Sequence, residues 1–296
     1  MEEPAAVDLY WIPCGRVRPR AMLTDYHVHL RPDEQDTPPE RYFTAANAER
    51  YRVAAEEQGI AELGVAEHVH RFTAALGVWE HPWWRAWARD DLDDYCAFVR
   101  EETDLRLGIE ADFVPGREDR MANLLEDRPW DFVVGSVHFL RDDSLDTEEH
   151  SVWARGASPE RVWRRYFETV AESARSGLYD IVAHPDLVKV WGDRALRPEG
   201  DLRRYYEPAV EAFAETGIAV EVSTAGLRKP AGEIYPARPF LEMVLDAGCP
   251  IALSSDAHEP GQLGYRYEQA LELLDELGAR ELSVFENRTR RAEPIG

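Results

Sequence analysis

The chain is poor in cysteine: its 296 residues include three, at Cys14, Cys96 and Cys249. These lie far apart and form no CxxC pair, so the sequence argues against a disulfide-stabilised scaffold and against a thiolate zinc site. No apolar run approaches the roughly 20 residues that a membrane-spanning helix requires. The first residues have neither a basic opening nor a continuous apolar stretch, so we expect no secretory signal and a cytoplasmic protein.

Positive charge is also scarce, with 34 Lys and Arg residues against 57 Asp and Glu and a formal net charge of -23. Lysine occurs at Lys189 and Lys229 and nowhere else in the sequence. Because an acidic surface repels phosphate groups, we expect no nucleic-acid or membrane partner. The remaining composition, 44% hydrophobic and 31% charged residues, is that of an ordinary globular protein. The sequence gives no indication of oligomeric state.

Short apolar runs alternate with longer amphipathic stretches, which is typical of βα units and a parallel sheet. Seven strands are predicted at Met22–Leu30, Ile60–Glu67, Arg106–Asp112, Phe132–His138, Ile181–His184, Ile218–Ser223 and Ile251–Ser255, with Leu282–Phe285 as a candidate eighth. Helices are predicted at Pro39–Gln58, Asp91–Thr103, Glu118–Glu126, Pro159–Ser176, Leu202–Thr216, Pro236–Ala247 and Gln262–Leu277. Glycines such as Gly59 and Gly217 follow several of these helices, as left-handed C-caps do, and Gly278 breaks that pattern.

No linker-like, low-complexity or repeated segment divides the chain. We therefore predict one α/β domain, a βα barrel, over residues 22–296. Residues 1–21 are an N-terminal extension in this interpretation. Met22 is an alternative start, because it directly precedes the first predicted strand.

The histidines are concentrated at the carboxyl ends of predicted strands. In a βα barrel these ends form one rim, where the active site is assembled, so we expect the side chains to converge on one pocket. Imidazole and carboxylate together are the ligands that borderline divalent metals prefer. The set consists of His27, His29, His68, His138, His184 and His258, with the acids Glu110 and Asp256. The other three histidines, His70, His81 and His150, are expected to be ordinary structural residues.

These residues stand in motifs that resemble the PHP (polymerase and histidinol phosphatase) superfamily. The motifs occur in order as His27-Val28-His29, Glu67-His68, Glu110, Ser136-Val137-His138, His184-Pro185 and Asp256-Ala257-His258. The runs GIEADFVPG, GSVHFL, STAGLRKP and SSDAH are similar to the monofunctional histidinol-phosphatase branch. The resemblance extends from Leu23 to about Glu286.

The resemblance implies a distorted seven-stranded βα barrel that holds two to three divalent metals. Ligand sets of His and carboxylate accept Zn, Mn or Fe. A first metal would be held by His27, His29, Glu110 and Asp256, and a second by Glu110, His138 and His184. A third would be held by His68 and His258, with an acid from the segment after the first motif. That segment offers Asp33, Glu34 and Asp36, of which we favour Asp36; the alternative is that these acids belong to a solvated loop.

The resemblance further implies a metal-dependent phosphomonoesterase that hydrolyses L-histidinol phosphate, a histidinol-phosphatase-like step of histidine biosynthesis, by a metal-bound hydroxide. Catalysis would rest on Glu110, His138, His184 and Asp256. Arg228 resembles the phosphate-contacting arginine of the family, and Lys189 is a second candidate for substrate binding. Divalent metals would reverse the local charge that the acidic chain presents to a phosphate.

Several alternatives stay open. The substrate is either histidinol phosphate or another small phosphate ester, and a non-catalytic metal-binding barrel is a third possibility. An amidohydrolase-type barrel is disfavoured, because it usually needs a carboxylated lysine at a mid-barrel strand end, and neither lysine of this chain occupies one. Asp25 orients a ligand imidazole or is an ordinary strand residue, and Arg228 binds phosphate or pairs with a surface acid. The tryptophan-rich segment 78–87 is either a lid over the pocket or a loop packed on the barrel.

Overall fold

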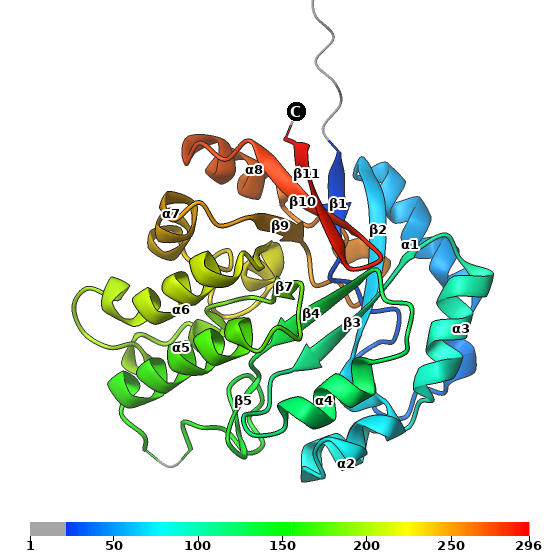
Figure 1. Cartoon of the computed structure of the whole chain (residues 1–296), viewed down its shortest axis with the longest axis horizontal. Coiled ribbons are helices and arrows are strands. Elements are labelled where there is room, and N and C mark those ends of the chain that lie inside the picture. The colour runs from blue at the N-terminus through cyan, green and yellow to red at the C-terminus, as the bar shows by residue number, and fades with distance from the viewer. Residues whose placement is uncertain (1–21, 155, 296) are drawn as a thin grey trace, which may run out of the picture.

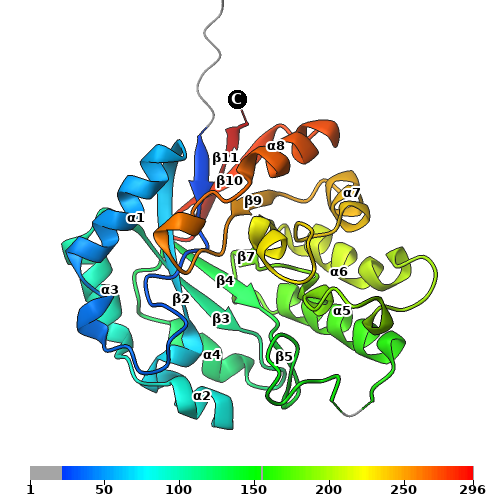
Figure 2. The same ribbon diagram turned by 180° about the vertical axis from the view of Figure 1, so that it is seen from behind.

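The computed structural model describes residues 22–154 and 156–295. Seven parallel strands pair in the order β1-β2-β3-β4-β7-β8-β9 and curl into a nearly closed barrel (Figures 1 and 2). Beyond β1 and β9 the chain closes the ring through a parallel bridge between Val28 and Ala257. The strands are β1 (Leu23–Asp25), β2 (Ile60–His68), β3 (Arg106–Asp112), β4 (Phe132–Ser136), β7 (Ile181–Val182), β8 (Ala219–Ser223) and β9 (Ile251–Ser254). The predicted single-domain, seven-stranded barrel is confirmed, while the predicted extension, residues 1–21, lies outside the described residues.

Helices cover the outside of the barrel (Figure 1). They are α1 (Ala45–Glu57), α2 (Pro82–Trp87), α3 (Leu92–Glu102), α4 (Glu118–Leu125), α5 (Pro159–Arg175), α6 (Arg203–Thr216), α7 (Arg238–Asp246) and α8 (Tyr267–Glu276). Side chains cap several N-termini; Asp91, for example, accepts hydrogen bonds from the backbone N–H groups of Asp93 and Asp94 at the start of α3. Gly217 ends α6 with φ 69°, and Gly278 has φ 79° after α8. Gly278, which was expected to break the pattern, is therefore also a left-handed glycine that follows a helix. None of the helices in the described residues is both long and apolar enough to cross a membrane.

Two predicted helices are much shorter in the structure, and the others end within two residues of their predicted bounds. The first splits into a 3₁₀ turn, Pro39–Arg41, and α1, because Thr44 is extended and accepts a hydrogen bond from the N–H of Asn47 as an N-cap. The last begins at Tyr267, since Gly264 and Arg266 before it have left-handed backbones with φ 60° and 56°. The first strand is also shorter than predicted and ends at Asp25; its register with β2 shifts between Leu23 and Thr24.

The candidate eighth strand does not join the barrel. Instead β10 (Glu281–Glu286) pairs antiparallel with β11 (Thr289–Pro294). The sequence did not predict β11 because its residues, TRRAEP, show no apolar alternation and are almost all exposed. Figures 1 and 2 show the hairpin beside β9 and β1.

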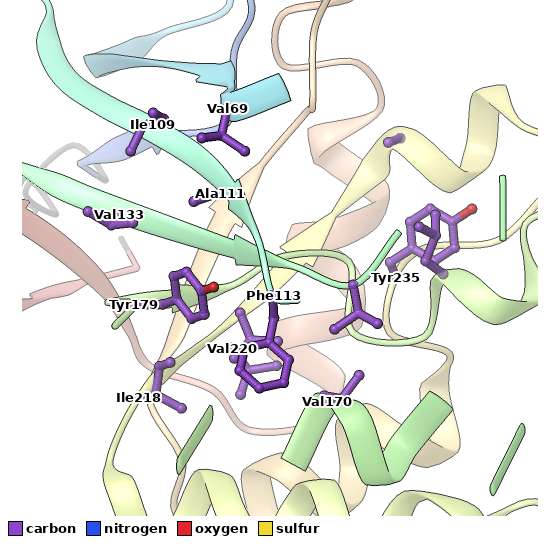
Figure 3. Close-up of a cluster of buried hydrophobic side chains, with 14 of the residues drawn as sticks. Val69, Ile109, Ala111, Phe113, Val133, Val170, Tyr179, Ile218, Val220 and Tyr235 are labelled. Carbon is purple, nitrogen blue, oxygen red and sulfur yellow. The ribbon is translucent and has the colours of Figure 1, made fainter. Parts of the chain in front are cut away.

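Alternate strand residues face the two sides of the sheet. Phe132 of β4 lies in an inner cluster that also contains Tyr26 and Phe285 of β10, with ring centroids of Tyr26 5.0 Å from Phe132 and 5.7 Å from Phe285. Val133 and Val220 face the helices instead, in a cluster that also contains Val170 of α5 (Figure 3). The hairpin residue Phe285 thus helps fill the interior of the barrel.

Candidate metal centre

The carboxyl ends of the strands bring the predicted ligands together. His68 ends β2 and Glu110 lies within β3, while the other ligands follow their strands by two or more residues. His27, His29, Glu110 and His184 are at most 3% exposed. The convergence predicted from the sequence is therefore present in the fold.

Glu110 lies at the centre of the cluster. Its Oε2 is 3.4 Å from His27 Nε2 and 3.7 Å from His29 Nε2, and it also contacts His68 Nδ1. Its Oε1 is 3.4 Å from His138 Nε2 and 3.3 Å from His184 Nε2. The two oxygens of one carboxylate thus face two different groups of histidines.

Asp256 completes the first of these groups. Its Oδ1 is 3.3 Å from His29 Nε2 and 3.8 Å from His27 Nε2. Asp256 and His184 have left-handed backbones, with φ 50° and 22°, which non-glycine residues rarely adopt. Such conformations persist where surrounding contacts fix them, and they concentrate at functional sites.

A third group of side chains lies towards the solvent. The Nε2 atoms of His68 and His258 are 3.4 Å apart, and His258 Nε2 is 3.4 Å from Asp33 Oδ1. His29 stacks on both imidazoles, with ring centroids 4.2 Å from each. The ligand atoms of His29, His68 and His258 are close enough to share one ion, as are those of His27, His29 and Asp256 and those of His27, Glu110 and His184.

The donor set fits divalent cations. His27 Nε2, His29 Nε2, Glu110 Oε2 and Asp256 Oδ1 are buried and find no hydrogen-bond partner among the described residues. Buried polar atoms are nearly always paired, and unpaired ones indicate a missing ion or water. Since these nitrogens and oxygens face one another, a cation between them satisfies all four at once. The cluster therefore supports binding of divalent metal ions.

Two carboxylates that the sequence did not single out orient the ligand imidazoles. Glu221 Oε1 is 2.7 Å from His27 Nδ1, and its Oε2 accepts the backbone N–H of His184. Asp112 Oδ1 is 2.7 Å from His138 Nδ1. A ligand histidine commonly donates its second ring N–H to such a carboxylate, which fixes the tautomer. Their signal in the sequence is an acid inside an apolar strand, as in AVEVS and GIEAD.

Burial and charge set the protonation of the cluster. Burial alone would raise the pKa of Glu110, but the charges of His68, His27 and His138 hold it well below its usual range. Burial lowers the pKa of His29 to about 3, with a further contribution from His258. Burial also opposes protonation of His138, but Asp112 and Glu110 raise its pKa to about 10. A metal ion at His138 has to displace that proton, whereas His29 is already neutral.

The segment after the first motif corrects one prediction. Asp36 lies outside the cluster: its side chain is 87% exposed and pairs with Arg89 at 2.9 Å. Asp33 instead lies beside His258 and also accepts from Arg71 Nη2 at 2.6 Å. Partial desolvation by the neighbouring side chains tends to raise the pKa of Asp33, but His258 and Arg71 lower it, so the carboxylate is ionised at neutral pH. Spacing along the chain did not reveal which acid turns inwards, because that depends on the fold of the loop.

Lys189 also departs from its predicted role. Its buried ammonium lies 2.8 Å from Asp186 Oδ2 and donates to the carbonyl oxygen of Ile234 at 2.8 Å. Asp186 in turn accepts the backbone N–H of Ala237. The lysine is committed to neutralising a buried carboxylate, so the structure corrects its prediction as a substrate contact.

Arg228 lies at the end of the 3₁₀ turn after β8, Thr224–Arg228. Its Nη2 donates to the backbone carbonyls of Ser255 and Asp256, at 2.8 Å each. Its Nη1 is buried and has no hydrogen-bond partner among the described residues. The guanidinium therefore supports the loop that carries Asp256, while its Nη1 group keeps its hydrogen-bonding capacity unused. No surface acid pairs with Arg228 among the described residues.

Asp25 does not orient an imidazole. Its carboxylate accepts from the backbone N–H of Ser255 at 3.0 Å and from the Ser255 hydroxyl, which ties β1 to the end of β9. Burial raises its pKa to about 6, against the opposing effect of the Ser255 hydrogen bonds. Glu221 holds the imidazole of His27 instead.

The tryptophan-rich segment lies beside the cluster. Trp84 is fully buried, whereas Trp83 and Trp87 of α2 are half-buried, with ring centroids 6.5 and 6.1 Å from His70. His70 itself stacks on His68 at 4.8 Å. The segment therefore combines packing on the barrel with an aromatic wall next to the site.

Comparisons with known proteins identify the family of the chain. Residues 42–225 match the model of the PHP domain family. The chain is 32% identical over 279 residues to the probable histidinol-phosphatase of Deinococcus radiodurans. The alignment covers 92% of this chain and 99% of that protein. It is 33% identical over 190 residues to the histidinol-phosphatase of Bacillus subtilis, across 58% of this chain and 70% of the relative.

Solved structures show the same fold. The histidinol phosphate phosphatase of Lactococcus lactis, in complex with zinc, L-histidinol and phosphate, superposes with a TM-score of 0.67 at 18% identity, over 91% of this chain and 99% of that one. A putative histidinol phosphatase from Listeria monocytogenes gives a TM-score of 0.63 at 19% identity, over 84% and 99% of the two chains. The family match spans more than half of the chain and the Deinococcus relative is matched over nearly its whole length, so this chain belongs to the PHP domain family.

Proposed function

We propose that this chain hydrolyses L-histidinol phosphate to L-histidinol and phosphate, as a metal-dependent phosphomonoesterase. The observation that carries the proposal is the position of Glu110, whose two oxygens face two separate groups of histidines. A bridging carboxylate between neighbouring cations is typical of sites that hydrolyse phosphate esters. The names of the relatives, and the ligands in the Lactococcus structure, support histidinol phosphate as the substrate.

The geometry supports two buried ion positions and one at the rim. We assign His27, His29, Asp256 and Glu110 Oε2 to the first position. Glu110 Oε1, His138 and His184 form the second. His68, His258 and Asp33 form the third, with Asp33 in place of Asp36. His and carboxylate donors accept zinc, manganese or iron, so the donor set does not select among them.

The chain's own residues bind the substrate, hold the metal ions and orient the ligand side chains. Bound divalent ions supply the charge that attracts the phosphate and the acidity that activates the attacking water. Glu221 and Asp112 keep the His27 and His138 tautomers fixed. We assign phosphate binding to Arg228, whose Nη1 has no hydrogen-bond partner among the described residues; a charge-assisted hydrogen bond from it to a phosphoryl oxygen would strengthen binding. The catalytic set is therefore Glu110, His138, His184 and Asp256, with Arg228 as the substrate contact.

The test is turnover of a panel of phosphate monoesters by metal-reconstituted protein, with metal content measured in parallel. We expect histidinol phosphate to be the best substrate and His138→Ala and His184→Ala to lose both the second ion and turnover. His150→Ala is the matched control, because His150 is exposed and outside the cluster. Turnover of another ester in preference to histidinol phosphate would move the proposal to that substrate, and bound metal without any turnover would indicate a non-catalytic barrel.

A further inference from the structure

Arg71 is a buried arginine at the edge of the cluster. It ends the 3₁₀ turn that follows β2, Val69–Arg71, and it is 1% exposed. A buried guanidinium is costly unless hydrogen bonds and an opposite charge compensate it. Glu67, also fully buried, supplies that charge, with its Oε2 2.7 Å from Arg71 Nη1.

The guanidinium connects three parts of the rim. Besides Glu67, its Nη1 donates to the backbone carbonyl of Arg31 at 2.9 Å, and its Nη2 donates to Asp33 Oδ1 at 2.6 Å. Glu67 Oε1 accepts the backbone N–H groups of Leu30 and Arg31, at 2.6 and 3.0 Å. The pair of Glu67 and Arg71 thereby fixes both the backbone that follows His29 and the side chain of Asp33.

Asp33 needs such a contact because its side chain is 60% exposed. An exposed carboxylate on a loop samples several rotamers in water, and ordering it costs conformational entropy. Held by Arg71, Asp33 Oδ1 lies 3.4 Å from His258 Nε2. The carboxylate is then already in place beside the two rim histidines.

A cation next to a metal position also has an electrostatic cost, since like charges repel. Here the charge of Arg71 is balanced by Glu67 at 2.7 Å. The net charge of the pair is zero, so its main effect on a nearby ion is through the position of Asp33. A different arginine and aspartate pair of this loop, Arg89 and Asp36, is exposed, with side chains 49% and 87% accessible, and has no such role.

We propose that Arg71 is a positioning residue that holds Asp33 against His258 and so determines whether the third metal ion is retained. This inference rests on the proposed metal centre. Its main effect is on the rim position, because Arg71 donates to Asp33 and to none of the buried-position ligands among the described residues; Glu67, the partner of Arg71, lies 3.9 Å from His29 Nδ1.

The experiment measures metal content and metal affinity of the reconstituted full chain. Metal per chain is determined by elemental analysis after dialysis, and stepwise affinities by calorimetric titration, for wild type, Arg71→Met, Asp33→Ala and the control Arg89→Met. We expect three ions in wild type and in Arg89→Met. In Arg71→Met and Asp33→Ala the third ion should bind roughly 10- to 100-fold more weakly, as when other residues that orient metal ligands are replaced. The two buried ions should be weakened less than the rim ion in Arg71→Met and should be unchanged in Asp33→Ala.

A double variant separates positioning from a general effect on stability. If Arg71 acts through Asp33, then Arg71→Met in the Asp33→Ala background should weaken the third ion no further. Unchanged third-ion affinity in Arg71→Met, or in Asp33→Ala if Arg71→Met fails to fold, would overturn the inference. A wild type that binds two ions also overturns it while leaving the proposed function intact. A wild type that binds no metal would instead refute the proposed function.

Discussion

The six histidines of the cluster fall into two groups that the fold supports differently. His27, His29, His138 and His184 form an inner group, with side chains 1%, 0%, 9% and 3% exposed. His68 and His258 form a rim group, which is 14% and 16% exposed and has Asp33 beside it. The inner histidines follow β1, β4 and β7, whereas the rim position depends on two loops, those carrying Asp33 and His258.

Support from neighbouring carboxylates differs in the same way. Glu221 and Asp112 each hold an inner imidazole at 2.7 Å and are themselves buried in strands. At the rim, His258 Nδ1 faces the backbone carbonyl of Asp256 at 3.2 Å, and Asp33 relies on Arg71. Ligands held on rigid elements bind an ion with less ordering cost than ligands on loops. We therefore expect tight inner ions and a more easily exchanged rim ion.

Replacing Glu110 should have the largest effect, because it joins the two inner positions. In Glu110→Gln we expect a loss of turnover greater than the roughly 10- to 100-fold typical of residues that only orient ligands, together with loss of at least one inner ion. The measurements are kcat/KM for histidinol phosphate and metal content. Near-normal activity with a full metal complement would contradict the central role of this carboxylate.

Glu221→Gln tests the support of the inner group. The amide keeps the shape but not the charge that accepts the His27 N–H, so we expect inner-site metal affinity to fall roughly 10- to 100-fold. The rim ion should be affected less. Glu286→Gln is the control, since Glu286 is 46% exposed and pairs with Arg106 at the first residue of β3, whereas Glu110 lies near the other end of that strand. Equal losses at inner and rim positions would remove the distinction between the two groups.

Arg228→Ala should separate phosphate binding from metal binding. Loss of a charge-assisted hydrogen bond costs about 1.5–3 kcal/mol, which corresponds to roughly a ten- to hundred-fold fall in kcat/KM and in inhibition by inorganic phosphate. Glu110, His138 and His184 make no hydrogen bond to Arg228 among the described residues, so the second ion should stay bound. Arg228→Lys should recover part of the loss, because an ammonium keeps the positive charge but lacks the paired N–H donors of the planar guanidinium. Unchanged phosphate inhibition would leave Arg228 as a support of the Asp256 loop.

Asp36→Asn should have the smallest effect. Its carboxylate is exposed and pairs with the exposed Arg89, and such surface pairs contribute little to stability. Metal content, kcat/KM and the free energy of unfolding should stay close to wild type, with the unfolding free energy within about 0.5 kcal/mol. A lost third ion in this variant, with Asp33→Ala unaffected, would restore Asp36 as the rim ligand.

The sequence by itself determined the barrel and most of the cluster. Alternating apolar and amphipathic segments specify parallel βα units, and parallel strands place their carboxyl ends on one rim. Histidines and acids that follow those strands, such as His27, Glu110 and Asp256, therefore meet whatever the details of the loops. The same reasoning correctly left His150 outside the cluster.

Only the tertiary structure decided which loop acid turns inwards and which charges are already paired. Asp33 and Asp36 are equivalent in type and nearly adjacent in the chain, but buried Arg71 selects one of them. The sequence does not reveal a partner for Lys189, but in the fold its charge is neutralised by Asp186, which lies 2.8 Å from it. Glu221 and Asp112 became visible as supports of His27 and His138 once their distances were known. Side-chain direction in loops and pairing of buried charges depend on contacts between residues far apart in sequence, which periodicity along one chain does not encode.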